Sequence, residues 1–237
     1  MSNAANFRNL LSSGKMIVAP GAIDCITGRA IAQAGFSAAY MTGAGTSATL
    51  GYPDYGLITM NEMVGNAGRI ANSIDIPLIS DSDTGFGNEL NVFRTVQEFE
   101  RAGVAAIHIE DQVFPKKCGH LDNKELVSRE DFIAKIRAAS AARKSRDFCI
   151  IARTDSRAVA GLDEAVERAN AALANGADVA FVEAPQTMEE IESVPKRVNG
   201  PCLLNVVRGG KTPEIDLDVA ERMGYAIAIV PGLLLGG

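Results

Sequence analysis

Tryptophan is absent from this chain of 237 residues, and aromatic side chains make up only 5% of it. Basic residues are interspersed among a larger number of acidic ones, which gives a formal net charge of −6. Proteins that bind nucleic acid usually present a basic face, often with aromatic side chains on which bases stack. The sequence shows neither feature, so we expect no nucleic-acid partner.

The chain also lacks an apolar stretch of about 18 residues, the length that a membrane-spanning helix needs. Its N-terminus lacks the apolar core of a signal peptide. The cysteines lie far apart without a CxxC pair, a pattern typical of reduced thiols in a cytoplasmic protein; they are Cys25, Cys118, Cys149 and Cys202. All but Cys118 have apolar neighbours and are expected in the core. We predict a cytoplasmic protein with no membrane partner.

Short apolar runs alternate with longer amphipathic segments along the whole chain. Several of these runs are continuous rather than alternating, as is typical of parallel strands buried on both faces. The predicted strands span residues 16–20, 38–42, 76–80, 105–110, 148–154, 179–183, 202–207 and 226–230. Their even spacing indicates a parallel α/β architecture.

The segments between the strands have helical periodicity and recognisable ends. Thr59 and Glu62 have the spacing of a capping box, and a glycine follows several segments, as at helix C-termini. The predicted helices span residues 24–33, 59–72, 89–102, 128–143, 163–175, 187–198 and 213–223. Strict alternation of strand and helix predicts parallel pairing with right-handed crossovers.

These strand–helix units predict a TIM-type (β/α)8 barrel that forms one α/β domain over residues 1–237. A doubly wound sheet is the alternative for the same alternation. No eighth helix follows the last strand. Either another chain covers the outside of the first and last strands, or sequence is missing there.

Acidic residues follow two neighbouring strands at the end that carries the active site in such barrels. Asp81 and Asp83 follow the third strand, and Glu110 ends the fourth. Carboxylate oxygens from separate strands suit Mg²⁺, with Mn²⁺ as a second choice, whereas the two histidines lack the spacing of a zinc site. The alternative is that these acids cap helices or pair with Arg153.

A cysteine with basic neighbours follows the fourth strand, in the run Lys116-Lys117-Cys118-Gly119-His120. Positive charge on both sides is expected to lower the pKa of the Cys118 thiol and to make it a better proton donor and nucleophile. Its loop position is typical of mobile active-site elements. Together with the acids, this thiol predicts metal-assisted chemistry on an oxygen-rich small molecule.

Two further strand ends could bind a carboxylate. Arg153, at the end of the fifth strand, is suited to bidentate binding, although it could instead form a structural salt bridge to Glu183 or Asp155. Residues 42–45 form a small-residue loop after the second strand. The backbone N–H groups of this loop could hold an anion, or the loop could simply turn the chain. His108 either faces the acids or points into the barrel.

Five motifs together resemble the isocitrate lyase/phosphoenolpyruvate mutase superfamily over essentially the whole chain. They are Lys-Lys-Cys-Gly-His (116–120), Asp-Ser-Asp-Thr-Gly-Phe-Gly (81–87), Ile-Glu-Asp-Gln (109–112), Gly-Tyr-Pro-Asp (51–54) and Ala-Arg-Thr-Asp (152–155). The resemblance implies a TIM-type barrel whose eighth helix is exchanged between the subunits of a homotetramer.

The resemblance also implies a site for a 2-hydroxy or 2-oxo acid. The residues implied for Mg²⁺ are Asp81 directly and, through water, Asp83, Glu110 and Asp54. Those implied for the substrate carboxylate are the backbone near Thr42, Gly43 and Ala44, and Arg153. Those implied for the rest of the pocket are Asp54, Gly119, His120, Glu183 and Asn205. Lys116, His120 and Arg153 are also implied as catalytic residues.

In lyases of the superfamily, a C–C bond is cleaved in a retro-aldol (Claisen-type) step. The cysteine matching Cys118 then protonates the resulting carbanion from a closing loop. Tyr40 is one candidate for the base that takes the substrate hydroxyl proton. The presence of Cys118 favours a lyase or a related oxaloacetate hydrolase over a phosphonomutase.

Two positions bear on the choice of substrate. Oxaloacetate hydrolases tend to carry Ser where this chain has Pro231, which favours a lyase. Arg208 replaces an acid expected in methylisocitrate lyases, which leaves room for other 2-alkylmalates such as 2,3-dimethylmalate. The alternatives are an oxaloacetate hydrolase or decarboxylase on the same scaffold, and a catalytically silent barrel that binds a dicarboxylate or serves as an oligomeric scaffold.

Overall fold

The computed structural model describes residues 2–119 and 123–234. Its parallel strands pair in sequence order, and β8 pairs with β1 to close a barrel. The strands are β1 (Ile17–Ala22), β2 (Ala39–Met41), β3 (Leu78–Asp81), β4 (Ala106–Glu110), β5 (Cys149–Thr154), β6 (Val179–Val182), β7 (Cys202–Asn205) and β8 (Ile227–Val230). The predicted TIM-type barrel is confirmed, and the doubly wound sheet is excluded because no strand is left as an edge.

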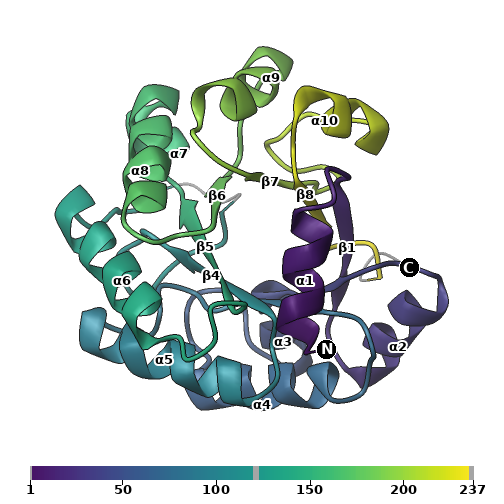
Figure 1. Ribbon diagram of the computed structural model, residues 1–237. Helices are drawn as coiled ribbons and strands as arrows, with labels where there is room; N and C mark the ends of the chain where they lie inside the picture. Colours follow the sequence, from purple (N-terminus) through teal and green to yellow (C-terminus); the bar gives the residue numbers. More distant parts are fainter. Residues whose placement is uncertain (1, 120–122, 235–237) are drawn as a thin grey trace.

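Helices surround most of this barrel (Figure 1). They are α1 (Asn3–Leu11), α2 (Cys25–Gln33), α3 (Gly43–Thr49), α4 (Met60–Ala71), α5 (Glu89–Arg101), α6 (Arg129–Ala142), α7 (Arg157–Ala160), α8 (Leu162–Ala174), α9 (Met188–Arg197) and α10 (Leu217–Met223). None of the helices in the described part of the chain is both long enough and apolar enough to cross a bilayer.

The ends of several helices follow the predicted local chemistry. The Glu62 carboxylate accepts from the Thr59 N–H at 2.7 Å, and the Thr59 hydroxyl accepts from the Glu62 N–H at 3.4 Å, so the capping box of α4 is present. α10 begins at Leu217 rather than at residue 213, because the Asp216 side chain caps the helix there. The predicted C-terminal glycines with positive φ are Gly35, Gly103, Gly176 and Gly224.

Three helices, α1, α3 and the short α7, have no counterpart among the predicted segments. α1 packs at the amino end of the barrel, where Phe7 is fully buried among side chains of the barrel interior. Arg8 donates to the backbone oxygens of Asp147 and Phe148, just before β5. α1 therefore covers the end of the barrel opposite the predicted site.

The thiols divide between the core and the surface. Cys149 and Cys202 are buried, as predicted, and burial raises the pKa of Cys202 to about 12. Cys25 is only partly buried, so its placement in the core was wrong. It is the first residue of α2, where a side chain lies at the edge of the helix–barrel contact.

Residues 231–234, the last that are described, lie in a turn after β8. The exchange of an eighth helix between subunits therefore stays a prediction.

We expect Phe7→Ala to lower the free energy of unfolding by about 3 kcal/mol, because it leaves a cavity at the amino end of the barrel. Urea-induced unfolding followed by circular dichroism would measure the change. Leu10→Ala on the same helix is the matched control, with a smaller expected loss because Leu10 is only partly buried. A loss below about 1 kcal/mol for Phe7→Ala would contradict the role of α1 as a packed cover.

Candidate active site

A cavity of about 180 Å³ lies among the polar side chains at the carboxyl ends of the strands. Its lining includes many predicted site residues, namely Tyr40, Thr42, Ala44, Asp54, Asp81, Lys116, Cys118, Gly119, Arg153, Glu183 and Asn205. Gly43, Asp83 and Glu110 do not line it, but each contacts a residue that does. His120 lies outside the described residues. The fold thus brings the described candidates together.

Residues 42–45 form the first turn of α3 rather than the predicted loop. Glycine-rich runs have low helix propensity, so the local sequence did not reveal this turn. The Thr42 hydroxyl caps it by accepting from the Gly45 N–H at 3.4 Å. The Gly43 N–H donates to Asp81 at 3.2 Å, so it holds a carboxylate of the barrel itself.

Asp81 is buried, and the backbone holds both of its carboxylate oxygens. Oδ1 accepts from the Asp83 N–H at 2.9 Å, and Oδ2 accepts from the Gly43 N–H. A Cβ at Gly43 would lie 2.3 Å from Oδ2, so only glycine allows this approach. Burial alone would raise the pKa of Asp81, but His108, which is charged only at low pH, and Lys116 outweigh it, and the pKa lies below its ordinary value. The carboxylate is therefore ionised at neutral pH.

Carboxylate oxygens beside Asp81 lack hydrogen-bond partners within the described part of the chain. They are Oδ2 of Asp83 and both carboxylate oxygens of Glu110. Burial raises the pKa of Asp83 to about 6 and that of Glu110 well above its ordinary value. Such oxygens suit a hard divalent cation and its bound water, so the residues present fit the predicted metal.

The same residues do not form a closed shell of protein ligands. Among residues 2–119 and 123–234, no group of three or more His, Cys, Asp or Glu side chains is placed to hold an ion directly. Mg²⁺ usually keeps several waters and takes only one or two carboxylates from the protein. Asp81 as a direct ligand with the other acids acting through water is consistent with this geometry.

Lys116 brings a positive charge from the loop after β4 into the acidic cluster. Its ammonium lies 2.5 Å from Asp54 Oδ1 and 3.1 Å from Asp83 Oδ1, and the side chain is only 3% exposed. Burial alone would lower the pKa of Lys116, but these carboxylates and Asp81 raise it well above its ordinary value. The loop before α4 and the loop after β4 are thereby joined over the acids.

Arg153 is surrounded by carboxylates. Its guanidinium lies 3.0 Å from Asp155, 3.2 Å from Glu110 and 3.4 Å from Glu183, and it stacks 5.2 Å from the centre of the Phe181 ring. The structural salt bridges that the sequence left open are therefore present. Because Arg153 also lines the cavity, binding of a substrate carboxylate stays a prediction.

Tyr40 and His108 lie beneath the acids, inside the barrel. The Tyr40 hydroxyl is 2.9 Å from His108 Nε2, and that nitrogen is 3.6 Å from Asp81 Oδ1. Burial lowers the pKa of His108 to about 4, so the imidazole is neutral at pH 7. Burial also raises the pKa of Tyr40 well above its ordinary value, which makes its phenolate hard to form and weakens its case as the base.

Cys118 and Gly119 lie on the wall of the cavity. A Cβ at Gly119 would lie 2.5 Å from Arg153 Nη2 and 2.7 Å from Glu183 Cγ, so the loop rests directly on these two side chains. Asn205 donates to Glu183 at 3.1 Å, and no described residue partners its side-chain oxygen. That oxygen is free to meet a substrate.

One buried charge at this site was missed from the sequence. Lys124 is only 6% exposed; its ammonium donates to Asp155 Oδ1 at 2.8 Å and also to the Gly119 oxygen. A single lysine in a polar loop gives no sequence signal, because such side chains are usually solvated.

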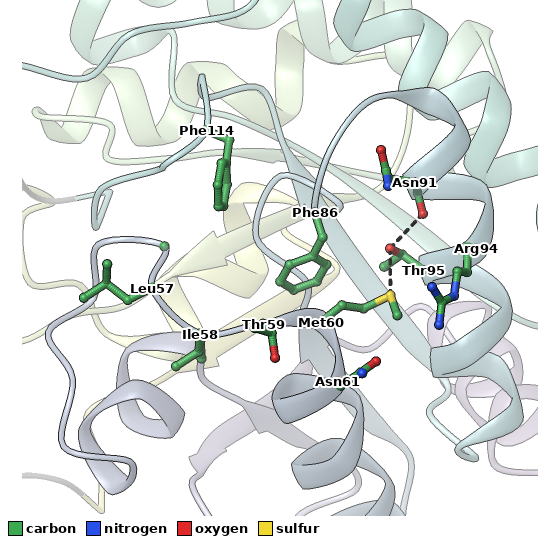
Figure 2. Close-up of a pocket in the computed structure, with 11 residues that line it drawn as sticks. Leu57, Ile58, Thr59, Met60, Asn61, Phe86, Asn91, Arg94, Thr95 and Phe114 are labelled. Atoms are coloured by element: carbon green, nitrogen blue, oxygen red, sulfur yellow. Dashed lines mark hydrogen bonds between the residues drawn. The ribbon is translucent and has the colours of Figure 1, made fainter.

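A second hollow, of about 370 Å³, lies between the starts of α4 and α5 (Figure 2). Its wall includes Leu57, Met60, Phe86 and Phe114, with Arg94 at one side. No carboxyl or thiol group lines it, so it offers no acid–base chemistry. The chemistry of this protein is therefore assigned to the cavity at the end of the barrel.

Known proteins match nearly all of this chain. The phosphoenolpyruvate phosphomutase family matches residues 7–235. The 2,3-dimethylmalate lyase of Eubacterium barkeri is 50% identical over 232 residues, which cover 98% of this chain and 80% of that protein. The 2-methylisocitrate lyase of Aeropyrum pernix is 46% identical over 224 residues, which cover 94% of this chain and 72% of that protein.

Solved structures agree with these sequence matches. A crystal structure of 2,3-dimethylmalate lyase has a TM-score of 0.96 at 44% identity and covers 100% of this chain and 80% of that one. A structure of oxaloacetate acetylhydrolase with 3,3-difluorooxalacetate has a TM-score of 0.96 at 41% identity, with 99% and 81% covered.

The raised pKa of Asp83 predicts how stability depends on pH when no divalent cation is present. The pKa is about 6 in the folded protein against an ordinary 3.8, so between these values the folded state holds a proton that the unfolded state has lost. Compared with Asp83→Asn, the wild-type protein should therefore lose roughly 1–3 kcal/mol of stability as the pH rises through this window. Urea unfolding in EDTA would measure it. A free-energy difference that does not change with pH would refute the prediction.

Proposed function

The chain belongs to the phosphoenolpyruvate mutase/isocitrate lyase superfamily and is a carbon–carbon lyase, and we propose that its substrate is a 2-alkylmalate of the 2,3-dimethylmalate type. The observation that carries this proposal is the apolar part of the cavity lining, to which Val207 and Pro231 contribute. A methyl substituent fits such a wall better than a charged group does.

The cations near the cavity also favour a dicarboxylate over a tricarboxylate. Lys116 and Arg153 line the cavity, and both already pair with carboxylates of the protein. Arg208, which stands where methylisocitrate lyases are expected to carry an acid, is 96% exposed, lies 3.9 Å from Glu214 and lines a different hollow. No further lysine or arginine lines the cavity among the described residues, so none of these is left to pair with the additional carboxylate of 2-methylisocitrate.

The proposed reaction is the cleavage of the C2–C3 bond of the substrate. A base takes the proton of the C2 hydroxyl and later returns it to the Cys118 thiolate, the hydroxyl oxygen becomes the carbonyl oxygen of pyruvate, and the electron pair of the broken bond stays on C3. The Cys118 thiol then gives its proton to C3 and releases the second carboxylate, which is propionate in the case of 2,3-dimethylmalate. Proton transfer from a positioned thiol avoids a free carbanion in water.

A Mg²⁺ ion, or Mn²⁺ in its place, would draw electron density from the hydroxyl and carboxylate oxygens of the substrate when bound at Asp81 and, through water, at Asp83, Glu110 and Asp54. The residues of the chain would hold the rest of the substrate. Those proposed to bind its carboxylate are Arg153 and the first turn of α3, with Thr42, Gly43 and Ala44; those proposed for the remaining pocket are Lys116, Gly119, His120, Glu183 and Asn205.

We further propose a cytoplasmic homotetramer. The support is that the cysteines are free thiols and that a resemblance to the superfamily implies this assembly.

Hydrolysis of oxaloacetate is the second candidate, because oxaloacetate acetylhydrolase superimposes on the chain with a TM-score of 0.96. Pro231 on the cavity wall argues against it, since a hydroxyl is expected there in hydrolases.

The full-length protein with Mg²⁺ should release pyruvate from 2,3-dimethylmalate with a higher kcat/KM than from 2-methylisocitrate, and EDTA should abolish the reaction. Coupling to lactate dehydrogenase would measure pyruvate, with isocitrate and oxaloacetate as comparison substrates. Oxalate formed from oxaloacetate, with no cleavage of alkylmalates, would replace the proposal by the hydrolase alternative.

Cys118→Ser should lower kcat about 100-fold or more, because a hydroxyl is a far weaker acid than a thiol at neutral pH. Binding of Mg²⁺, followed by calorimetry, should be unchanged. Cys25→Ser is the matched control, since this thiol lies on α2 away from the cavity, and it should retain wild-type turnover. Equal turnover of the Cys118→Ser and wild-type proteins would exclude the thiol as the proton donor.

A further inference from the structure

The segment that carries Cys118 is tied to the barrel at its base. The Val113 N–H donates to the Glu125 oxygen at 2.8 Å, which pairs the two ends of the segment. The Gln112 side chain donates to the Lys117 oxygen at 2.8 Å and accepts from the Lys117 N–H at 3.0 Å. These contacts hold the entry to the segment but do not reach the cavity wall.

Two lysines of the segment make contacts at the wall: Lys116 pairs with Asp54 and Asp83 before Cys118, and Lys124 makes the contact after it. Its ammonium bridges two groups, the backbone oxygen of Gly119 and the carboxylate of Asp155 at 2.8 Å. The side chain is 1% exposed and the Asp155 side chain is fully buried. A buried ammonium pays a large desolvation cost unless it is paired and hydrogen-bonded, so its position is strongly specified.

Asp155 is itself fixed to the barrel. Its N–H donates to Asp111 Oδ1 at 2.8 Å, and its carboxylate accepts from Arg153 at 3.0 and 3.2 Å. Although burial alone would raise the pKa of Asp155, the charges of Arg153 and Lys124 hold it well below its ordinary value. Lys124 is therefore anchored to an ionised group that does not move with the loop.

From these contacts we infer that Lys124 is the positioning residue that holds the Cys118 segment against the cavity, by joining the Gly119 oxygen to Asp155. Gly119 directly follows Cys118 and rests on Arg153. Fixing the Gly119 oxygen therefore fixes where the thiol stands relative to the substrate. Only the expected effect of Lys124 on turnover rests on the proposed function. The expected effect of Lys124 on the position of the thiol is independent of that function.

The reactivity of each thiol in the full-length, metal-free protein tests the inference without any substrate. Iodoacetamide alkylation is followed peptide by peptide by mass spectrometry, with Cys25 as the internal reference. In Lys124→Met we expect Cys118 to react at least about fivefold faster, because the segment opens more often. Loss of a nearby positive charge by itself would slow alkylation, so a faster reaction reports release of the segment.

Matched variants distinguish a change in the position of Cys118 from a general loss of folded structure. Lys135→Met also removes a buried ammonium, one that donates to the Thr84 oxygen at 3.1 Å, and should leave the Cys118 rate within about twofold of wild type. The buried Cys149 and Cys202 report unfolding. Should they become reactive in Lys124→Met, the milder Lys124→Gln replaces it; this variant removes the charge that pairs with Asp155, so Cys118 is again expected to react faster than in the wild-type protein.

Turnover gives the second readout. With a substrate that the wild-type protein cleaves, Lys124→Met should lower kcat about tenfold or more and change KM little, because the proton donor is misplaced while the substrate site persists. Lys124→Arg, which keeps the charge, should recover part of kcat. Equal Cys118 alkylation in wild type and in the folded Lys124 variant would overturn the inference. Absence of any diacid cleavage by the wild-type protein would instead overturn the proposed function, and the alkylation result would still stand.

Discussion

Carboxylates crowd the carboxyl end of this closed barrel, and burying them is tolerable only if cations lie among them. Three buried cations, Lys116, Lys124 and Arg153, meet this need. Only Arg153 comes from a strand. The other two come from the segment after β4, so charge pairing helps to bind that segment to the barrel.

This origin of the cations links the folding of the site to its chemistry. The segment that balances the charge of the acids also carries Cys118, which lines the cavity, so the pairing of the two lysines and the placement of the thiol are linked. Asp83 and Glu110 keep oxygens that no described donor satisfies. A divalent cation with its water shell would complete the charge balance that the lysines leave unfinished. The fold thus provides an incomplete site, whose remaining charge suits a metal ion together with an acidic substrate.

Much of the fold could be predicted because its signals are local. Continuous apolar runs, the capping box at Thr59 and Glu62 and the glycines after the helices each depend on a few neighbouring residues. α1 and α3 were missed for different reasons. Phe7 is buried by packing against distant strands, and the glycines of α3 oppose a helix that only its cap and its burial stabilise. Cys25 was placed in the core because its sequence neighbours are apolar, which does not tell on which side of α2 it lies.

For the site, the sequence by itself determined the chemical groups: acids at strand ends, a thiol between basic residues and an arginine at the end of β5. The alternation of strands and helices brings all strand ends, and with them these groups, to one face of the barrel. Only the tertiary structure decided which charges pair. The partners of Lys116, Lys124 and Arg153 lie on other segments, and burial decides the ionisation of Asp83 and Tyr40. The charge pairs and the ionisation states depend on distances between residues that are set only when the barrel has formed. The reason is that the Coulomb energy and the desolvation cost depend on where a residue lies in the fold and not on its type.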